Sequence, residues 1–289
     1  MIHAWIEAMR LRTLPVSLAG VAAAWGVAIS SPTGYSSVAV IACCLFALLC
    51  QISSNFANEY FDFKNGLDRP GREGPRRGVT EGDITPSAMR NATFGTLAIA
   101  CVIGLWIAWQ GGWWLIGAGI VIALGVLAYS SGPYPLSHHG LGEVAVLFFF
   151  GIIPVNLTVY VSTGQFMTDA ILLSIAIGLM GSNVLIVNNY RDIDDDRVVN
   201  KNTLAVIFGR HTASNLYMLN GLVSQAVMIP IWERMAAGWI ISAVYLLIHV
   251  ILWRMLTSRQ GASLTPVLGM TAVTMFIFSL LFDAIVALT

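Results

Sequence analysis

The chain has 289 residues, of which 57% are hydrophobic and only 10% are charged, and 15 basic residues balance 15 acidic ones. A soluble domain carries about a quarter charged residues, so this composition excludes a soluble globular protein and predicts an integral membrane protein. The zero net charge argues against a nucleic-acid binder. The four cysteines lie in apolar runs without zinc-ligand or disulfide spacing, which predicts small packing residues.

Apolar stretches recur along the whole chain. A hydrocarbon layer of about 30 Å needs about 20 apolar residues per helix. Nine stretches of this kind cover roughly 14–31, 36–57, 90–109, 112–130, 141–162, 169–189, 212–231, 237–256 and 264–286. The sequence therefore predicts an all-α, polytopic membrane protein, with one domain over residues 1–289 and nine transmembrane helices. No signal-type cleavage site precedes the first span, which is expected to remain uncleaved.

The basic residues test this assignment, because loops between nine spans alternate between the two sides of the membrane. Arg234 alone falls on one side. The other fourteen basic residues fall on the opposite side: Arg10, Arg12, Lys64, Arg69, Arg72, Arg76, Arg77, Arg90, Arg191, Arg197, Lys201, Arg210, Arg254 and Arg259. Cytoplasmic loops carry the excess of Lys and Arg. The asymmetry supports the span count and predicts a cytoplasmic N-terminus.

Two polar loops, at about 59–89 and 190–211, are predicted to cap the cytoplasmic side. Each begins with the pattern Asn-x-Tyr-x-Asp, at 58–62 and again at 188–192. The second copy continues into a cluster with aspartates at 192, 194, 195 and 196. This pseudo-repeat predicts two similar helix–loop units that face each other across one cavity.

Each motif aims oxygen ligands in one direction. Asn58 and Asp62 are four residues apart, as are Asp192 and Asp196, and such pairs share a helix face. Asp68 follows Gly66, where the chain can turn back toward Asp62. Carboxylates this close repel one another unless a hard cation lies between them. Oxygen ligands alone favour Mg²⁺ or Ca²⁺ over zinc.

Basic residues follow each acidic motif and supply the other half of a metal-bridged phosphate site. They are Arg76 and Arg77 after the first motif, and Lys201 and Arg210 after the second. A polyprenyl diphosphate fits both parts of such a site: its diphosphate suits the polar, metal-binding end, and its hydrocarbon chain suits the apolar spans. Mg²⁺ would neutralise its diphosphate as a leaving group, and the bundle would shield the allylic cation from water.

At these residues the sequence resembles the UbiA-type intramembrane prenyltransferases, and within them the branch that uses 1,4-dihydroxy-2-naphthoate. The matching stretches are Arg10-x-Arg12-Thr13-Leu14-Pro15, Asn58-Glu59-x-x-Asp62-x-x-x-Gly66-x-Asp68, Gly74-Pro75-x-Arg77-Gly78, Gly132-Pro133-Tyr134-Pro135-Leu136 with Gly140-Leu141-Gly142-Glu143, and Asn188-Asn189-x-Arg191-Asp192-x-Asp194-x-Asp196-Arg197 leading to Lys201-x-Thr203-Leu204-Ala205-Val206. They span about residues 10–210. The family's nine-helix plan around a central cavity accommodates the remaining spans.

The resemblance implies Mg²⁺-dependent transfer of a polyprenyl group from its diphosphate to 1,4-dihydroxy-2-naphthoate, with loss of carbon dioxide and diphosphate, giving demethylmenaquinone. The residues carried over as metal ligands are Asn58, Asp62, Asp68, Asp192 and Asp196, and those expected to be catalytic are Asp62, Asp192, Asp196 and Lys201. Those expected to bind substrate are Arg12, Asn58, Arg77, Tyr129, His139, Glu143, Asn188, Asn189 and Arg191. Tyr129 would stabilise the cation through its ring face.

Two departures and several alternatives stay open. Glu59 stands where the family usually has Asp, and His138-His139 stand where the hydroxybenzoate branch has a basic residue. The acceptor-orienting base is one of Glu143, His139, Asn189 and Arg191. Alternative acceptors are 4-hydroxybenzoate, homogentisate or haem, and the rival class is a cation or lipid transporter, whose site would lie near the bilayer midplane. The prenyl chain length and the oligomeric state are undetermined.

Overall fold

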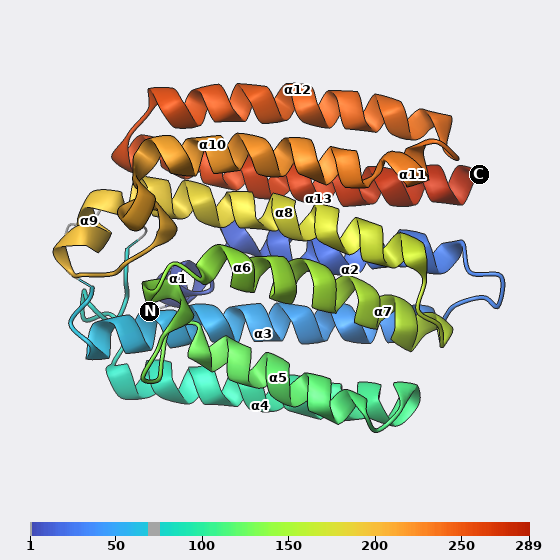
Figure 1. Ribbon diagram of the computed structural model, residues 1–289. Coiled ribbons are helices and arrows are strands. Elements are labelled where there is room, and N and C mark those ends of the chain that lie inside the picture. The colour runs from blue at the N-terminus through green and yellow to red at the C-terminus, as the bar shows by residue number, and fades with distance from the viewer. Residues whose placement is uncertain (1, 69–75) are drawn as a thin grey trace.

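The computed structural model describes residues 2–68 and 76–289, and within these ranges the chain is helical with short connections (Figure 1). The predicted site segment at Gly74 and Pro75, and the basic residues Arg69 and Arg72, lie outside the described residues. In chain order the elements are α1 (Ile2–Ala8), η1 (Leu11–Thr13), α2 (Leu14–Ile29), α3 (Ser37–Lys64), α4 (Pro86–Gly111), α5 (Leu115–Ala128), η2 (Leu136–His138), α6 (Gly142–Val146), η3 (Leu147–Ile152), α7 (Ile153–Thr163), α8 (Thr168–Arg191), α9 (Ile193–Val198), α10 (Leu204–Val227), α11 (Ile229–Trp232), α12 (Ala236–Ser258), η4 (Gly261–Leu264) and α13 (Thr265–Leu288).

The long helices lie where the apolar stretches predict them. Among the described residues, seven helical stretches are long and apolar enough to cross a membrane: Ile2–Ile29, Ser37–Lys64, Pro86–Gly111, Gly142–Thr163, Thr168–Arg191, Ala236–Ser258 and Gly261–Leu288. The 14-residue α5 and the 24-residue α10 lie where the fourth and seventh spans are expected. The all-helical membrane fold is confirmed. The count of nine spans stays a prediction, because α5 is short and α10 carries several polar residues.

Polar caps fix where three of the long helices begin. Ser36 accepts a hydrogen bond from Ala39 N ahead of α3, Thr85 from Ala88 N ahead of α4, and Thr203 from Val206 N ahead of α10. A side-chain oxygen at this position satisfies a backbone N–H that has no partner within the helix. These caps set the register of the helices that carry the functional loops.

One span is interrupted. The predicted helix at 141–162 is formed by α6, the π-helical segment η3 and α7 in succession. Pro154 lies just after the π segment, and proline removes one hydrogen bond from the helical ladder and crowds the preceding turn. The wider turn also brings Gly151 against α8, where a Cβ added to Gly151 would lie 2.4 Å from Gly178 Cα. Small residues let helices in a membrane approach this closely.

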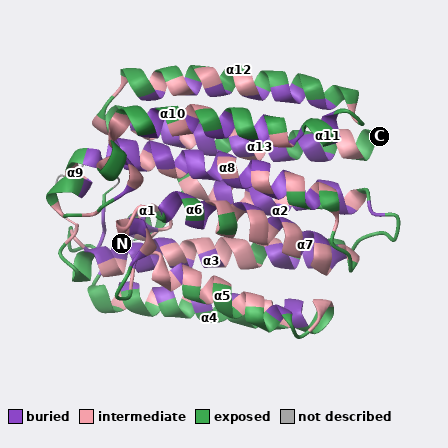
Figure 2. Ribbon diagram, in the orientation of Figure 1, coloured by how far each residue is buried: buried purple, intermediate pink, exposed green. Residues whose placement is uncertain are grey.

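Helix α8 is the centre of the bundle, and α4 and α12 are peripheral (Figures 1 and 2). In its apolar window 72% of the residues of α8 are buried, against 22% for α4 and 33% for α12. The main core cluster combines α2, α7, α8, α10, α11, α12 and α13, with Trp232, Tyr217 and Phe278 among its largest buried side chains. The second acidic motif follows directly from α8, so it is attached to the most rigidly packed helix.

The two ends of the bundle differ in charge. Arg234 lies beside α11 at one end and pairs with Asp169 at 2.7 Å. The other end carries α1, α9 and the loops after α3 and α5 (Figure 1), with the carboxylates and basic residues of both motifs. Helix α13 ends away from α1, as expected if the chain crosses the layer an odd number of times. The charged end is therefore the place for the candidate site.

Candidate active site

The first acidic motif lies on the last turns of α3. The apolar prediction ended this helix at about 57, whereas α3 continues to Lys64 and carries Asn58 and Asp62 on one buried face. Gly66 then adopts a left-handed conformation with φ 69°, and Leu67 N bonds to Asp62 O at 2.8 Å. This turn brings the Asp68 side chain back into a buried position, as the glycine predicts.

Asn58 is the hub of this side. Its Nδ2 donates to Asp62 Oδ2 and to Ser130 Oγ, both at 3.0 Å. Its Oδ1 accepts from Arg77 at 3.1 Å and also from Arg10. Arg77 Nε lies 3.3 Å from Asp68 Oδ2, so one buried guanidinium contacts both ends of the motif. In this arrangement Asn58 orients the acidic and basic groups around it, and its amide oxygen is engaged by guanidinium groups.

The second motif is split by a helix break. Helix α8 ends at Arg191, and Asp192 (φ −90°, ψ 7°) joins it to α9. Arg191 holds the Asp192 carboxylate at two points, Nε to Oδ1 at 2.6 Å and Nη2 to Oδ2 at 2.9 Å. Asp192 lines a large cavity, whereas Asp196 lines a smaller one. The four-residue spacing does not place these two carboxylates in the same cavity, because Asp192 lies at the break between α8 and α9 with its carboxylate held by Arg191, whereas Asp196 lies within α9.

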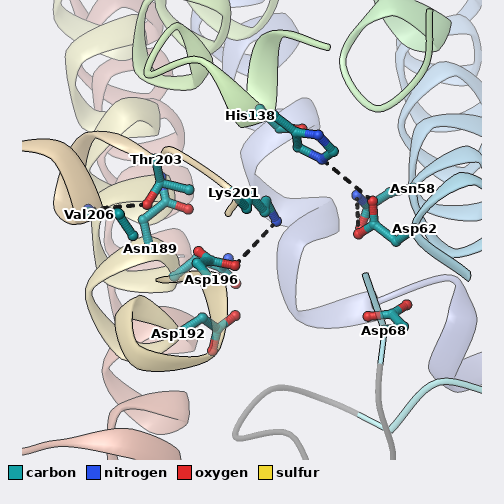
Figure 3. A network of polar contacts seen from close by, with 12 residues as sticks. Asn58, Asp62, Asp68, His138, Asn189, Asp192, Asp196, Lys201, Thr203 and Val206 are labelled. Atoms are coloured by element: carbon teal, nitrogen blue, oxygen red, sulfur yellow. Dashed lines mark hydrogen bonds and ion pairs between the residues drawn. The ribbon is translucent and has the colours of Figure 1, made fainter. Parts of the chain in front are cut away.

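Carboxylates of both motifs meet at the smaller cavity, which has a volume of about 20 Å³, room for about one water-sized sphere. Its lining includes Asp62, Asp68, Asp195 and Asp196, with Lys201 Nζ 3.6 Å from Asp196 Oδ1 (Figure 3). The structure thus shows the two motifs facing each other across a cavity, as the pseudo-repeat predicts. Asp195 is half-buried here, while Asp194 is exposed.

The donor set of this cavity fits a hard divalent cation. Every acidic lining group offers carboxylate oxygens, and Asp62 Oδ1 accepts no hydrogen bond from the described residues; His138 Nε2 lies 3.8 Å away. Within the described ranges, however, no three His, Cys, Asp or Glu side chains are gathered tightly enough to form a metal centre. Arg77 and Lys201 lie beside the carboxylates and balance their charge.

The larger cavity, about 460 Å³, is rich in cations. Its basic lining residues are Arg10, Arg12, Arg76, Arg77, Arg191 and Lys201. Asn188 and Asn189 of α8 and Tyr129 at the end of α5 also line it. Asp83 forms an ion pair with Arg76 and raises the pKa of that guanidinium. Six cationic side chains against two acidic ones, Glu7 and Asp192, around one space make a site for a multiply charged anion.

An apolar cavity of about 140 Å³ continues from the cation-rich one. Both are lined by Gln51, Ser54, Tyr129, Val146 and Phe150, so the two spaces are neighbours along one path. The apolar part runs between α3, α4, α5 and α7 and includes glycines at 104, 119 and 125. Tyr129, which is predicted to stabilise an allylic cation, lies at the junction of these two spaces.

The remaining predicted residues divide into two groups. Glu143 is buried and accepts a 2.8 Å hydrogen bond from Asn189, and Arg191 also donates to Asn188 at 2.9 Å, so these four belong to the cavity wall or directly behind it. His139 instead bonds Pro135 O at 2.8 Å and stacks on Tyr134 with ring centroids 3.6 Å apart. Its neighbour His138 is the histidine that faces Asp62 (Figure 3).

Four contributors were not among the candidate residues: Arg10, Ser130, His138 and Asp195. Arg10 shares the Arg-x-Arg segment with Arg12, and its backbone is left-handed with φ 51°, which directs it toward Asn58 while Arg12 is exposed. Sequence spacing could have flagged both arginines but not chosen between them. Ser130 belongs to none of the sequence motifs, so no pattern in the sequence predicts its contact with Asn58.

An all-helical membrane protein with a cation-rich cavity, a carboxylate cluster beside it and an apolar extension belongs to the class that holds an amphiphilic, phosphorylated substrate. Residues 19–280 match the model of the UbiA prenyltransferase family, and the chain belongs to this family.

Comparisons with individual proteins agree with this family assignment. The chain is 30% identical to a 1,4-dihydroxy-2-naphthoate octaprenyltransferase of Haemophilus influenzae, over 96% of this chain and 94% of the relative. It is 34% identical to the protein of the same name from Escherichia coli, over 82% and 80%. Among solved structures, it superposes on a UbiA homologue from Archaeoglobus fulgidus bound to GPP and Mg²⁺ with a TM-score of 0.70, 15% identity, and coverage of 97% of this chain and 99% of that one. This structural likeness confirms the fold.

Proposed function

We propose that the protein transfers a polyprenyl group from polyprenyl diphosphate to 1,4-dihydroxy-2-naphthoate, releasing diphosphate and carbon dioxide and giving demethylmenaquinone in its quinol form. The observation that carries this proposal is the continuous pair of cavities, one cationic and one apolar, beside the carboxylate cluster. Relatives named for the same reaction, matching over nearly the whole chain, support the choice of acceptor.

The cation-rich cavity would hold the diphosphate. Arg77 and Lys201 contact carboxylates at its edge and would donate to phosphate oxygens, and Arg10 and Arg12 line the same space from η1 and the turn before it. Guanidinium groups bind phosphate oxygens in a fixed fork. These contacts hold the leaving group in place while its bond to the allylic carbon breaks.

Asp62, Asp68, Asp195 and Asp196 would hold Mg²⁺ at the small cavity. Asn58 and Asp192, also expected as ligands, have their oxygens bonded to arginines and line the larger cavity, where they would position Asp62 and the arginines. When bound, the metal ion supplies charge neutralisation to the departing diphosphate. The protein's own part is to place the carboxylates: the turn at Gly66 aims Asp68, and the break at Asp192 aims Asp195 and Asp196.

The apolar cavity would take the prenyl chain and exclude water from the allylic cation. Phe46, Phe149 and Phe150 line it, and Tyr129 lies at its polar end. An aromatic ring face attracts a cation most strongly where water is absent. The electron-rich ring of the acceptor then attacks the allylic carbon, and the site would lie on the cytoplasmic side of a bacterial inner membrane.

A product assay tests the proposal. Purified protein in lipid is given Mg²⁺, a ladder of prenyl diphosphates, and separately 1,4-dihydroxy-2-naphthoate, 4-hydroxybenzoate or homogentisate, and products are identified by mass spectrometry. We expect a decarboxylated prenyl naphthoquinol, no product in excess chelator, and recovery on adding Mg²⁺ back. A preference for 4-hydroxybenzoate would assign the protein to a different acceptor. Ion or lipid flux without prenyl transfer would contradict the proposed activity altogether.

A further inference from the structure

Glu143 and Asn189 form a buried pair at the wall of the cation-rich cavity. Asn189 lies near the end of α8 and lines this cavity, and Glu143 lies in the first turn of α6 behind it. Asn189 Nδ2 donates to Glu143 Oε1 at 2.8 Å. Only 5% of Asn189 and 6% of Glu143 are exposed, so a change at either residue would leave a polar group of the other buried without this partner.

The position of Glu143 does not depend on Asn189. Ser182 Oγ donates to the backbone oxygen of Glu143 at 2.8 Å, which ties the start of α6 to α8 a second time. Gly142 allows the close approach, because an added Cβ would lie 2.9 Å from the Leu185 side chain. Ser182 and Asn189 are seven residues apart, about two turns, and therefore lie on one face of α8. The backbone thus holds the carboxylate in place, and Asn189 adjusts to it.

The carboxylate decides which way the Asn189 amide turns. An ionised carboxylate only accepts hydrogen bonds, so it takes the amide nitrogen of Asn189 and leaves the oxygen on the other side of the planar group. Because Asn189 lines the cavity, its Oδ1 is then presented as a hydrogen-bond acceptor at the cavity wall. A carbonyl oxygen attracts a hydroxyl group and repels the oxygens of a phosphate or a carboxylate.

We infer that Glu143 is a positioning residue for the aromatic acceptor: it holds Asn189 Oδ1 toward the cavity, where this oxygen accepts a hydrogen bond from a ring hydroxyl of the acceptor. The inference rests on the proposed function and names the specificity element within it. Five arginines also line the cavity and would attract both anionic substrates. The Glu143–Asn189 pair therefore distinguishes the hydroxylated ring from the diphosphate.

The test separates the two substrates kinetically. In Glu143→Gln the amide can offer either an oxygen or a nitrogen, so Asn189 is no longer held in one orientation. We expect the KM for 1,4-dihydroxy-2-naphthoate to rise about tenfold, the loss of roughly one hydrogen bond, with the KM for the prenyl diphosphate within about twofold of wild type. Asn189→Ala should do the same. The control is Ser174→Ala, which removes a hydrogen bond within α8 away from this pair and from the cavities, and which should leave both KM values near wild type.

Acceptor analogues identify the contact itself. Wild type should use one of 1-hydroxy-2-naphthoate and 4-hydroxy-2-naphthoate about tenfold less well than the dihydroxy compound, and Glu143→Gln should discriminate against that analogue little or not at all. Equal discrimination by wild type and variant, or equal rises in both KM values, would overturn the inference while leaving the function intact. If wild type instead uses another phenolic acceptor, the proposed function fails, and the same comparison with that acceptor still decides the role of Glu143.

Discussion

At the residue scale, neighbouring side chains in the same motif have different surroundings. Asp192 is held by Arg191 at the large cavity, Asp196 lies at the small cavity with Lys201, and Asp194 faces solvent with its side chain 71% exposed. The functional difference between these acids therefore comes from where the short helix α9 points them. All of these residues are aspartates, so their residue type alone does not distinguish their roles.

Substitution of these acids gives the first prediction. Asp62→Asn and Asp196→Asn should lower prenyl transfer by about 10²-fold or more, because each removes a negative charge from the proposed metal site. Titration of activity with Mg²⁺ should show a weakened dependence on the metal. The matched control is Asp194→Asn, from which we expect near wild-type turnover; comparable losses in Asp194→Asn and Asp196→Asn would refute the assignment of the small cavity.

At the element scale, the site depends on three places where a helix ends, changes direction or widens. Gly66 ends α3 so that Asp68 returns, the break at Asp192 redirects α9, and η3 lets α6 and α7 pack against α8. The interruptions at Gly66 and Asp192 move polar groups into the cavity region, and the one at η3 allows close helix packing. Gly151 and Gly178, at the crossing of η3 and α8, make this packing possible.

Gly178 provides a stability prediction for that crossing. A Cβ at Gly178 would lie 2.7 Å from Leu147 O and 2.6 Å from the Leu147 side chain, so Gly178→Ala should destabilise the protein by about 1–3 kcal/mol through overpacking. Thermal unfolding in detergent measures this. Gly95→Ala in α4 is the control, since an added Cβ there meets nothing within 4 Å and alanine favours the helix. A Gly178→Ala protein as stable as Gly95→Ala would contradict the close crossing.

Helix α5 gives a prediction about chain length. Gly119 lines the apolar cavity and has nothing within 4 Å of an added Cβ, so Gly119→Leu should place a side chain inside the proposed path of the prenyl tail. Transfer from geranyl diphosphate should persist, whereas transfer from an octaprenyl donor should fall at least about tenfold. The control is Gly117→Leu, two residues away on the exposed side of α5. A loss independent of donor length would place the tail elsewhere.

At the scale of the whole molecule, the charged and apolar ends belong to one asymmetric bundle. The acidic motifs and the described basic residues except Arg234 gather at one end, and Arg234 with Asp169 marks the other (Figure 1). The asymmetry predicted from loops is thus present in the fold. Its orientation in a membrane rests on the excess of positive charge expected for cytoplasmic loops.

Labelling from each side of the membrane tests this orientation. In a background with the four native cysteines replaced, Asp194→Cys should react with a membrane-impermeant maleimide in inverted vesicles and not in intact spheroplasts. Gln165→Cys, in the connection between α7 and α8 at the opposite end, should show the reverse. Both positions are exposed, so accessibility differs only by side. The opposite labelling pattern would place the candidate site outside the cytoplasm.

Much of the fold followed from composition and spacing. Each predicted span corresponds to a helix because backbone groups in hydrocarbon must bond within the segment, and a run of about 20 apolar residues leaves few alternatives. The end of α3 differs from the apolar pattern. The helix continues to Lys64 because buried partners bond Asn58 and Asp62, which a hydropathy pattern treats as polar and terminal. Tertiary contacts outweigh local polarity there.

The sequence by itself determined the membrane class, the charged end and the paired acidic motifs, because hydrophobicity, charge and the helical period are local properties. Only the tertiary structure decided which members of each motif meet: Asp68 and Asp195 join Asp62 and Asp196, Arg10 reaches Asn58, and His138 rather than His139 faces Asp62. These pairings join residues far apart in the chain. They depend on helix breaks and left-handed turns whose directions are set by packing against α8, and no local pattern records those directions.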